Sequence, residues 1–259
     1  MRREDLRLLG TQLRYDLQQK YLGSIAGVYW ALLNPAMQIG MYLALVTLVF
    51  RARVGAAGDG RAGYAVFLLC GLGPWLALQE GVVSATTSVV RHGGLVKNLV
   101  FPRGLLPLSG ALTSCVSLGS SLVVALFISG TLGPGPGWSW AALALLVPLQ
   151  LALTVGAGLL LAPIHTFLRD TGQLLPVFMQ VVMLATPVVY ALEDVPSAAR
   201  PLCAWNPLFH LIDGYRRALH AGVGPDWGGL AYLAAWTAAV LLLGRALFRR
   251  TEGYFEAVV

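Results

Sequence analysis

The residue most able to take part in chemistry is Glu80, which lies inside a long apolar run beside Gln79. An ionised carboxylate is costly at membrane depth, so it is expected to face a partner, a water-filled cavity or the interior of a helix bundle. A proton relay would need a second titrating group, and none is evident near Glu80 in the sequence. Glu80 is therefore better interpreted as a hydrogen bond between helices or as part of the polar wall of a conduit.

Motifs typical of enzymes are missing from the sequence. There is no Gly-x-x-x-x-Gly-Lys-Ser/Thr, and neither of the two lysines, Lys20 and Lys97, follows a glycine, so ATP is not expected to bind by that loop. His-Glu-x-x-His, Cys-x-x-Cys and Gly-x-Ser-x-Gly are absent too. The 4 histidines are far apart, and the 3 cysteines have no paired spacing. We therefore expect no catalytic residue, no metal site and no cofactor in this chain.

The composition indicates a membrane protein. Hydrophobic residues make up 57% of the chain and charged residues 12%, with a mean hydropathy of +0.70. Soluble domains carry roughly twice that share of charge. The net charge of +6 does not indicate nucleic acid, because Lys and Arg are scattered over loops and ends without forming a basic face. We expect a single transmembrane domain over residues 1–259.

The apolar runs predict an all-α membrane protein with six transmembrane helices. A helix needs roughly 20 apolar residues to cross a bilayer. Five runs are long enough, and a shorter one ends near Pro187. Small residues one turn apart on the third span, such as Gly110 and Ser114, predict close contact between helices. The expected spans are residues 29–50, 64–90, 105–132, 138–164, 174–191 and 227–248.

Basic residues set the expected orientation. With six spans, both termini lie on one side together with two short loops, and this side carries twelve of the 18 Lys and Arg residues. Cytoplasmic loops of membrane proteins are enriched in Lys and Arg, so both termini are expected in the cytoplasm. Arg51 and Arg53 go against this rule.

Two polar segments on that side are short and basic. Residues 2–22 have leucines at spacings of three and four with cationic residues between them, which predicts an amphipathic helix on the membrane surface rather than one packed on another protein. Residues 91–108 lie between two apolar runs, and their middle, 95–101, predicts about two turns of helix ended by Pro102. Such a helix, held between two spans, can transmit a push from a soluble partner.

The segment before the last span is too polar to cross the membrane and too apolar for a free loop. In residues 192–221, Asn206 followed by Pro207 predicts a helix start. We expect two short re-entrant helices on the outer side. The alternative is an amphipathic helix that lies flat on the outer surface.

Several short motifs occur in order along the chain: Leu22-Gly23 followed by Tyr29-Trp30-Ala-Leu-Leu-Asn34-Pro35, Phe101-Pro102-Arg103 with Leu105-Leu106-Pro107, and Asn206-Pro207-Leu208 followed by Arg216. In this order they resemble the permease subunit of type-2 ABC exporters, in particular the branch that exports capsule polysaccharide and O-antigen. The resemblance covers essentially the whole chain.

The resemblance implies a transport subunit without its own nucleotide site in the bacterial inner membrane. It implies a homodimer that works with two copies of a separate ATPase, which binds ATP and magnesium, and that moves a lipid-linked polysaccharide outward. Periplasmic or outer-membrane export proteins are further expected partners, and nucleic acid is not. Residues 95–101 would be the coupling helix, and the residues expected to contact the ATPase are Arg14, Leu95, Val96, Lys97, Phe101, Pro102, Arg103 and Arg169.

Aromatic and charged residues near the dimer axis would line the path of the glycan. For the aromatic ones a place in the interfacial belt of the membrane is an equal alternative. Arg216 and Arg217 could attract an acidic glycan or a lipid phosphate, or pair with Asp213 or Glu193. The expected channel residues are Trp30, Tyr42, Trp75, Glu80, Tyr190, Trp205, Arg216 and Arg217.

Three other functions fit parts of the pattern. An ABC exporter of a small lipophilic compound would have a narrower and more apolar axis. A membrane-embedded transferase acting on lipid-linked sugars would need acids or histidines that converge at one depth, and Glu80, Glu193, Asp213 and His210 do not obviously converge. A proton-coupled carrier would depend on Glu80 alone.

Overall fold

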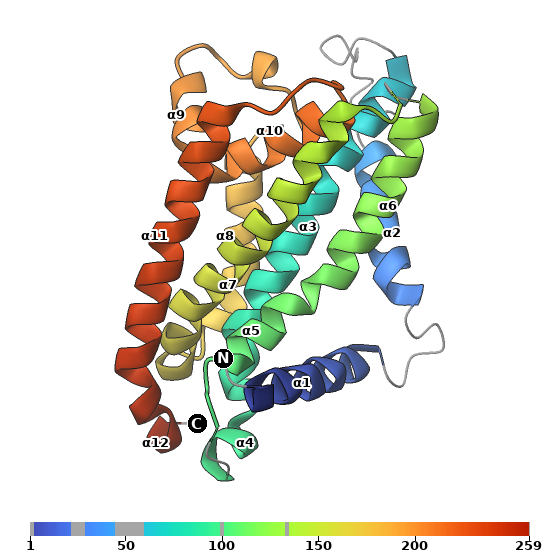
Figure 1. The fold of residues 1–259 in the computed structure, drawn as a ribbon. Helices are drawn as coiled ribbons and strands as arrows, with labels where there is room; N and C mark the ends of the chain where they lie inside the picture. Colours follow the sequence, from blue (N-terminus) through green and yellow to red (C-terminus); the bar gives the residue numbers. More distant parts are fainter. Residues whose placement is uncertain (1–2, 22–28, 45–59, 99–100, 133–134, 259) are drawn as a thin grey trace.

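The computed structural model describes residues 3–21, 29–44, 60–98, 101–132 and 135–258, and the regular structure within them is entirely helical (Figure 1). This confirms the predicted all-α class for the part of the chain that is described. The longest helices are α3 (Gly60–Arg91), α7 (Leu143–Phe167) and α11 (Trp227–Thr251). The other α-helices are α1 (Arg3–Tyr21), α2 (Trp30–Ala44), α4 (Gly93–Asn98), α5 (Leu105–Leu112), α6 (Ser114–Leu132), α8 (Thr171–Ala185), α9 (Arg200–Trp205), α10 (Pro207–Leu219) and α12 (Phe255–Val258).

Within the described ranges, four helical stretches are long and apolar enough to cross a membrane: Gly63–Arg91, Leu105–Thr131, Trp138–Phe167 and Trp227–Tyr254. They match the predicted second, third, fourth and last spans. The first predicted span is described only to Ala44, and residues 45–50 lie outside the described part. The predicted span at 174–191 is shorter in the structure, because α8 ends at Ala185 and Thr186 is extended.

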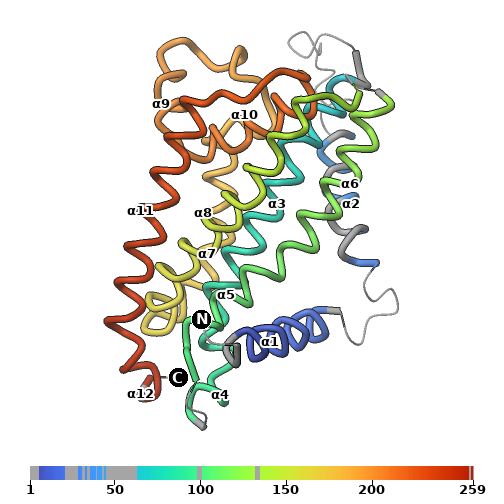
Figure 2. The backbone as a smooth tube through the Cα atoms, in the orientation of Figure 1, coloured from blue at the N-terminus to red at the C-terminus, as the bar shows by residue number. Residues whose placement is uncertain are grey.

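The helices form one bundle with two distinct ends (Figures 1 and 2). At one end, here called the terminal end, α1 lies across the bundle, and α4 and α12 are at the same end, so the described chain begins and ends there. At the opposite end, here called the far end, α9 and α10 lie over the long helices. The predicted surface helix and the predicted coupling segment therefore share the terminal end, while the segment predicted to be re-entrant is at the far end.

Small residues allow the long helices to pack closely. A Cβ on Gly110 would lie 2.8 Å from the carbonyl oxygen of Ser84 in α3, so the predicted close contact at Gly110 is confirmed. A Cβ on Gly158 of α7 would lie 2.4 Å from the Cβ of Ala85. A Cβ on Gly244 of α11 would lie 2.5 Å from the carbonyl oxygen of Gly156 in α7. The axes of α3, α7 and α11 are thus set by backbone contact.

We expect Gly244→Val to destabilise the bundle by about 3 kcal/mol, because α11 and α7 must separate to admit the side chain. Unfolding of the purified protein in detergent would measure the loss. Gly119→Val in α6 is the matched control, because a Cβ there meets nothing within 4 Å. Equal stability of the two variants would show that close contact at Gly244 does not hold α11 in place.

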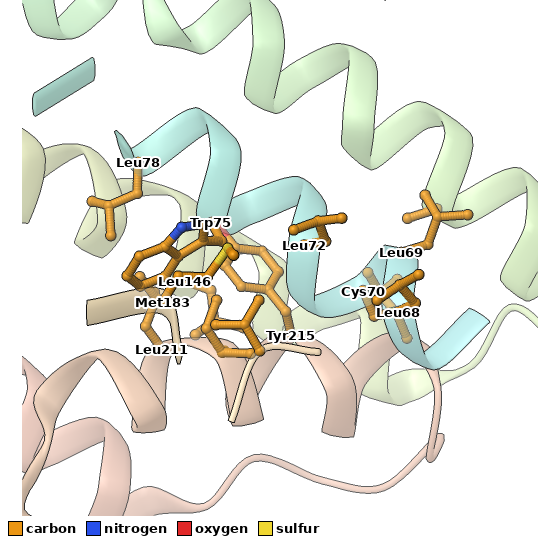
Figure 3. Packing of buried hydrophobic residues seen from close by; sticks show 14 of the residues in the cluster. Leu68, Leu69, Cys70, Leu72, Trp75, Leu78, Leu146, Met183, Leu211 and Tyr215 are labelled. Carbon is orange, nitrogen blue, oxygen red and sulfur yellow. The ribbon is translucent and has the colours of Figure 1, made fainter. Parts of the chain in front are cut away.

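The largest hydrophobic core joins α3, α7, α8 and α10 (Figure 3). Trp75 has 0% exposure and lies among Leu146, Met183, Leu211 and Tyr215, which come from these other helices. Apolar burial of this kind stabilises the far half of the bundle. Trp75 therefore lies in the core, neither beside a cavity nor at an exposed interfacial position.

The start of α10 follows the sequence prediction. The side chain of Asn206 accepts a hydrogen bond of 3.0 Å from the backbone N–H of Leu208, and Pro207 is the first helical residue. Asn206 also donates through Nδ2 to the hydroxyl of Thr186 at 2.7 Å. This cap fixes α10 against the end of α8.

Candidate functional site

A cavity of about 930 Å³ opens along the bundle between α1, α2, α3, α6 and α8. Most of its polar lining is uncharged, comprising amides and hydroxyls, and its charged lining consists of two acids and two bases. The lining residues are the charged Asp16, Lys20, Glu80 and Arg91; the polar Gln19, Gln38, Gln79, Gln180, Ser84, Thr113 and Ser117; and the aromatic Trp30 and Tyr42, with Met41, Gly73, Leu76, Ala77, Val83, Pro176 and Met183.

Glu80 lies on the wall of this cavity and connects three helices. One carboxylate oxygen forms an ion pair with Lys20 of α1. The other accepts a hydrogen bond of 2.6 Å from the hydroxyl of Ser117 in α6. The side chains of Lys20 and Glu80 are 35% and 30% exposed, so both reach the cavity while bound to each other. The expectation that Glu80 faces a partner or a water-filled cavity is confirmed.

Of the residues predicted to line a channel, Trp30 and Tyr42 join Glu80 at the cavity. Both come from α2, and Trp30 is 39% exposed. Gln38, on the same helix, adds an amide to the lining. The described part of α2 therefore presents rings and an amide to the cavity, a combination that can contact the faces and the hydroxyls of a sugar.

The two predicted arginines have backbone partners at the far end. Arg216 is 8% exposed, donates to the carbonyl oxygens of Pro187 (2.6 Å) and Val188, and lies 3.7 Å from the centroid of the Phe67 ring. Arg217 donates through Nε to the carbonyl oxygen of Gly224 at 3.2 Å. Neither arginine lines the cavity, and Arg216 holds the chain after α8 against α10.

The remaining predicted channel residues are also outside the cavity. Tyr190 donates its hydroxyl hydrogen to the carbonyl oxygen of Leu184 at 2.6 Å. Trp205 is 78% exposed at the end of α9, and its carbonyl oxygen accepts a hydrogen bond of 2.8 Å from Tyr232. These two aromatic side chains belong to the far end of the bundle.

The predicted coupling helix corresponds to α4, which begins at Gly93 and ends at Asn98; residues 99–100 lie outside the described part. Val96 has 0% exposure and belongs to a small core formed by Val89, Leu106, Ala162, Phe248 and Phe255, on which Phe101 also packs. This core joins α4 to α3, α5, α7, α11 and α12. A displacement of α4 would therefore be transmitted directly to the long helices.

The predicted coupling residues differ in their exposure at the terminal end. Lys97, Arg14 and Arg169 are exposed, Leu95 is half-buried and Pro102 is exposed. Arg103 instead turns inward and binds the carbonyl oxygen of Glu252 and the carboxylate of Glu256, so it fixes the C-terminal segment. Of the predicted coupling residues, Arg14, Lys97, Pro102 and Arg169 are exposed, while Val96, Phe101 and Arg103 hold the segment to the bundle.

A buried polar cluster fastens α1 to the start of this segment. Asp16 is 4% exposed, and its carboxylate oxygens lie 3.0 Å from Nε2 of His92 and 2.8 Å from the hydroxyl of Ser109, which donates to it. Nδ1 of His92 lies 2.9 Å from the carbonyl oxygen of Ser88, and Gln12 donates to Asp16 at 3.2 Å. The surface helix is thus bound to α3 and α5 through side chains.

The environment of Asp16 favours its ionised form. Burial raises the pKa of Asp16, but hydrogen bonds from His92 and Ser109, together with the charges of His92 and Arg91, outweigh burial and bring the pKa below its ordinary value of 3.8. A carboxylate whose pKa is lowered by folding stabilises the folded state at pH values above its ordinary pKa. That contribution is lost as the pH falls below 3.8 and through the pKa of the folded protein.

We expect Asp16→Asn to lower the free energy of unfolding at pH 7 by about 2 kcal/mol, because the buried donors around it lose a charged acceptor. The deficit relative to wild type should shrink as the pH falls below 3.8, where the wild-type carboxylate is also lost. Unfolding in detergent over this pH range would measure both effects. Arg14→Gln, an exposed change on the same helix, should leave stability unchanged; an equal loss in both variants would contradict the role given to Asp16.

The sequence did not predict the contacts across helices made by Asp16, His92, Ser109, Lys20 and Ser117. One signal was available for Asp16, because an acid among the basic residues of an amphipathic helix needs a partner. Nothing in the sequence pairs Lys20 with Glu80, which are 60 residues apart. These contacts arise only when α1 lies across the terminal end.

Comparison with known proteins identifies the family. Residues 8–220 match the family model described as ABC-2 type transporter. The chain is 27% identical to the O-antigen export system permease protein RfbA of Myxococcus xanthus, over 97% of this chain and 95% of that protein. It is 23% identical to the protein of the same name from Klebsiella pneumoniae, over 94% and 92%.

A further relative is the polysialic acid transport protein KpsM of Escherichia coli, 22% identical over 87% of this chain and 86% of that protein. The resemblance inferred from the motifs is therefore confirmed by relatives named for the export of O-antigen and the transport of polysialic acid. The family model covers most of the described helices, from α1 to the end of α10. The chain belongs to the ABC-2 type transporter family.

Proposed function

We propose that this chain is the permease of an ATP-driven exporter that moves a lipid-linked polysaccharide out of the cytoplasm. The observation that carries the proposal is the cavity, whose amide, hydroxyl and aromatic lining matches the groups of a sugar chain. The chain aligns over 97% and 94% of its length with permeases named for O-antigen export, which supports the same substrate class.

The cavity lining combines apolar residues with charged, amide and hydroxyl groups, and this mixture argues against the alternative of a small lipophilic compound, for which a purely apolar cavity would be expected. A transferase is also disfavoured. Of the acids and the histidine that could have formed its site, Glu80 is paired with Lys20 in the cavity, whereas Glu193, Asp213 and His210 lie at the far end. Among the described residues, no group of three His, Cys, Asp or Glu is placed to hold a metal ion.

In the membrane, the terminal end faces the cytoplasm and the far end faces outward. Six spans result when α2 lies in the first and α8 forms the fifth, with α9 and α10 re-entrant at the far end. Two copies assemble with two copies of a separate ATPase. The apolar face of α8, with Leu174, Val177, Phe178 and Leu184 each about 60% or more exposed, is available to lipid or to the second copy.

The mechanism follows from the attachment of α4. ATP binding closes the partner dimer and displaces α4, and the core around Val96 carries that displacement into α3 and α11. The cavity between α1, α2, α3, α6 and α8 widens as these helices move, and the glycan enters from the terminal end. This chain supplies the path, and its partner supplies the energy of ATP hydrolysis.

Charge reversal on α4 tests the proposal. The complex with the ATPase should survive purification, and Lys97→Glu should reduce transport-linked ATP hydrolysis at least fivefold by removing an exposed cation from the contact face. Phe101→Ala and Arg103→Ala are less informative, because both side chains also hold the bundle together. Arg200→Glu, an exposed charge reversal at the far end, is the matched control. Failure of any ATPase to co-purify, with normal membrane insertion, would contradict the proposal.

A further inference from the structure

We propose, on the basis of the proposed function, that the repeating unit of the exported glycan carries no net charge. The evidence is the charge balance of the cavity in the described part of the chain. Its ionisable lining residues are two acids, Asp16 and Glu80, and two bases, Lys20 and Arg91. Their formal charges cancel, so the wall has no excess of positive charge to attract an acidic polymer.

Each of these charged groups is already engaged within the protein. Lys20 and Glu80 form an ion pair with each other. Asp16 is bound by His92 at 3.0 Å and by Ser109 at 2.8 Å. Arg91 donates to the hydroxyl of Thr87 at 2.8 Å. A passing carboxylate would therefore have to displace an internal partner to gain a counter-charge.

The other cations of the described residues are not among the residues that line the cavity. Arg216 and Arg217 donate to backbone carbonyl oxygens at the far end. Arg103 is bound to the C-terminal segment, and Lys97 and Arg169 are on the outer surface of the terminal end. Conduits for anions and phosphates are typically lined by rings of Arg or Lys, and the lining of this cavity has no such ring among its described residues.

The uncharged polar lining suits sugar hydroxyls instead. Gln38 of α2, Gln79 of α3 and Gln180 of α8 come from three sides of the cavity. Each amide offers two donors and an acceptor, and each sugar hydroxyl can donate as well as accept. As the glycan moves, an amide can pass from one hydroxyl to the next, and no unpaired charge results. A carboxylate in every repeat would have to lose water without gaining a counter-ion, which is costly in a cavity within the membrane.

Relatives of this chain are named for O-antigen export and for transport of polysialic acid, an acidic polymer, so relationship alone does not decide the charge of the substrate. The groups that line the cavity are what favour an uncharged repeating unit. The proposal concerns the repeating unit only, and it applies whatever charge the lipid carrier has.

Export of two polymers that differ only in charge would test this proposal. The protein and its ATPase are produced in a Gram-negative host whose own polysaccharide permease has been deleted. The host makes either a neutral hexose polymer or the same polymer with a uronic acid in each repeat, both on polyprenyl diphosphate. Labelling intact and lysed cells gives the exported fraction. We expect the neutral polymer to be exported at least tenfold better than the acidic one.

Charge variants of the cavity test whether it sets this preference. Gln38→Arg combined with Gln180→Arg should raise the export of the acidic polymer, relative to the neutral one, at least threefold. Gln38→Glu combined with Gln180→Glu should lower that ratio further. Equal export of both polymers by the wild type overturns the proposal, and so does a ratio that neither pair of substitutions changes. Export of neither polymer by an assembled complex would instead refute the proposed function and this inference with it.

Discussion

Lys20→Glu is expected to reduce polysaccharide export at least tenfold. The substitution places a second carboxylate against Glu80 in a site that is only about a third exposed, where like charges repel strongly. Because this ion pair joins α1 to α3 beside the cavity, its loss would free the C-terminal end of α1 and change the shape of the path. The exported fraction of glycan on intact cells would measure the effect.

The reversed pair is the decisive control for this prediction. Lys20→Glu combined with Glu80→Lys restores opposite charges, and the hydroxyl of Ser117, which donates to Glu80 at 2.6 Å, can accept from a lysine instead. Export by the double variant should recover to at least half of the wild-type value. A double variant as defective as Lys20→Glu would show that the attraction between these two residues is not what matters.

Val96→Asp is expected to separate α4 from the bundle and abolish coupling. Val96 is fully buried among apolar side chains, and an uncompensated charge there costs on the order of several kcal/mol. The purified variant should have a lower unfolding temperature and should lose transport-linked ATP hydrolysis.

The matched control places the same side chain two residues away. A Cβ at Gly94, an exposed residue of α4, meets nothing within 4 Å, so Gly94→Asp should leave the unfolding temperature close to that of the wild type. Val96→Ala, which removes methyl groups without adding charge, should cost about 2 kcal/mol. If Val96→Asp were as stable as Gly94→Asp, the small core beneath α4 could not be what transmits its displacement.

Length and periodicity in the sequence were enough to predict the long helices. The apolar runs at 64–90, 105–132, 138–164 and 227–248 each correspond to a helix that could cross a membrane. An apolar run of about 20 residues is long enough to span the bilayer core as a helix. The start of α10 was predictable for a local reason. Asn206 accepts a hydrogen bond from a backbone N–H of the first turn, and Pro207 has no N–H that needs an acceptor. Close packing at Gly110 was predictable from its size.

Long-range partners could not be predicted in the same way. Arg216 was interpreted as a possible ligand for an acidic substrate, whereas in the structure it donates to two carbonyl oxygens left free after α8. The sequence shows neither that α8 ends at Ala185 nor that α10 brings Arg216 to the residues that follow α8. Similarly, the partners of Glu80 and Asp16 depend on how α1 lies across the bundle, which its own periodicity does not determine.

The claim on which the function depends is that α4 faces the ATPase, on the cytoplasmic side of the membrane. Labelling of Lys97→Cys by a membrane-impermeant maleimide tests it, with the unsubstituted protein reporting any labelling of Cys70, Cys115 and Cys203. We expect labelling in inside-out vesicles, protection when the ATPase is bound, and no labelling in sealed cells. Labelling of sealed cells would place α4 on the side of the membrane opposite the ATPase, and the proposed coupling would then be wrong.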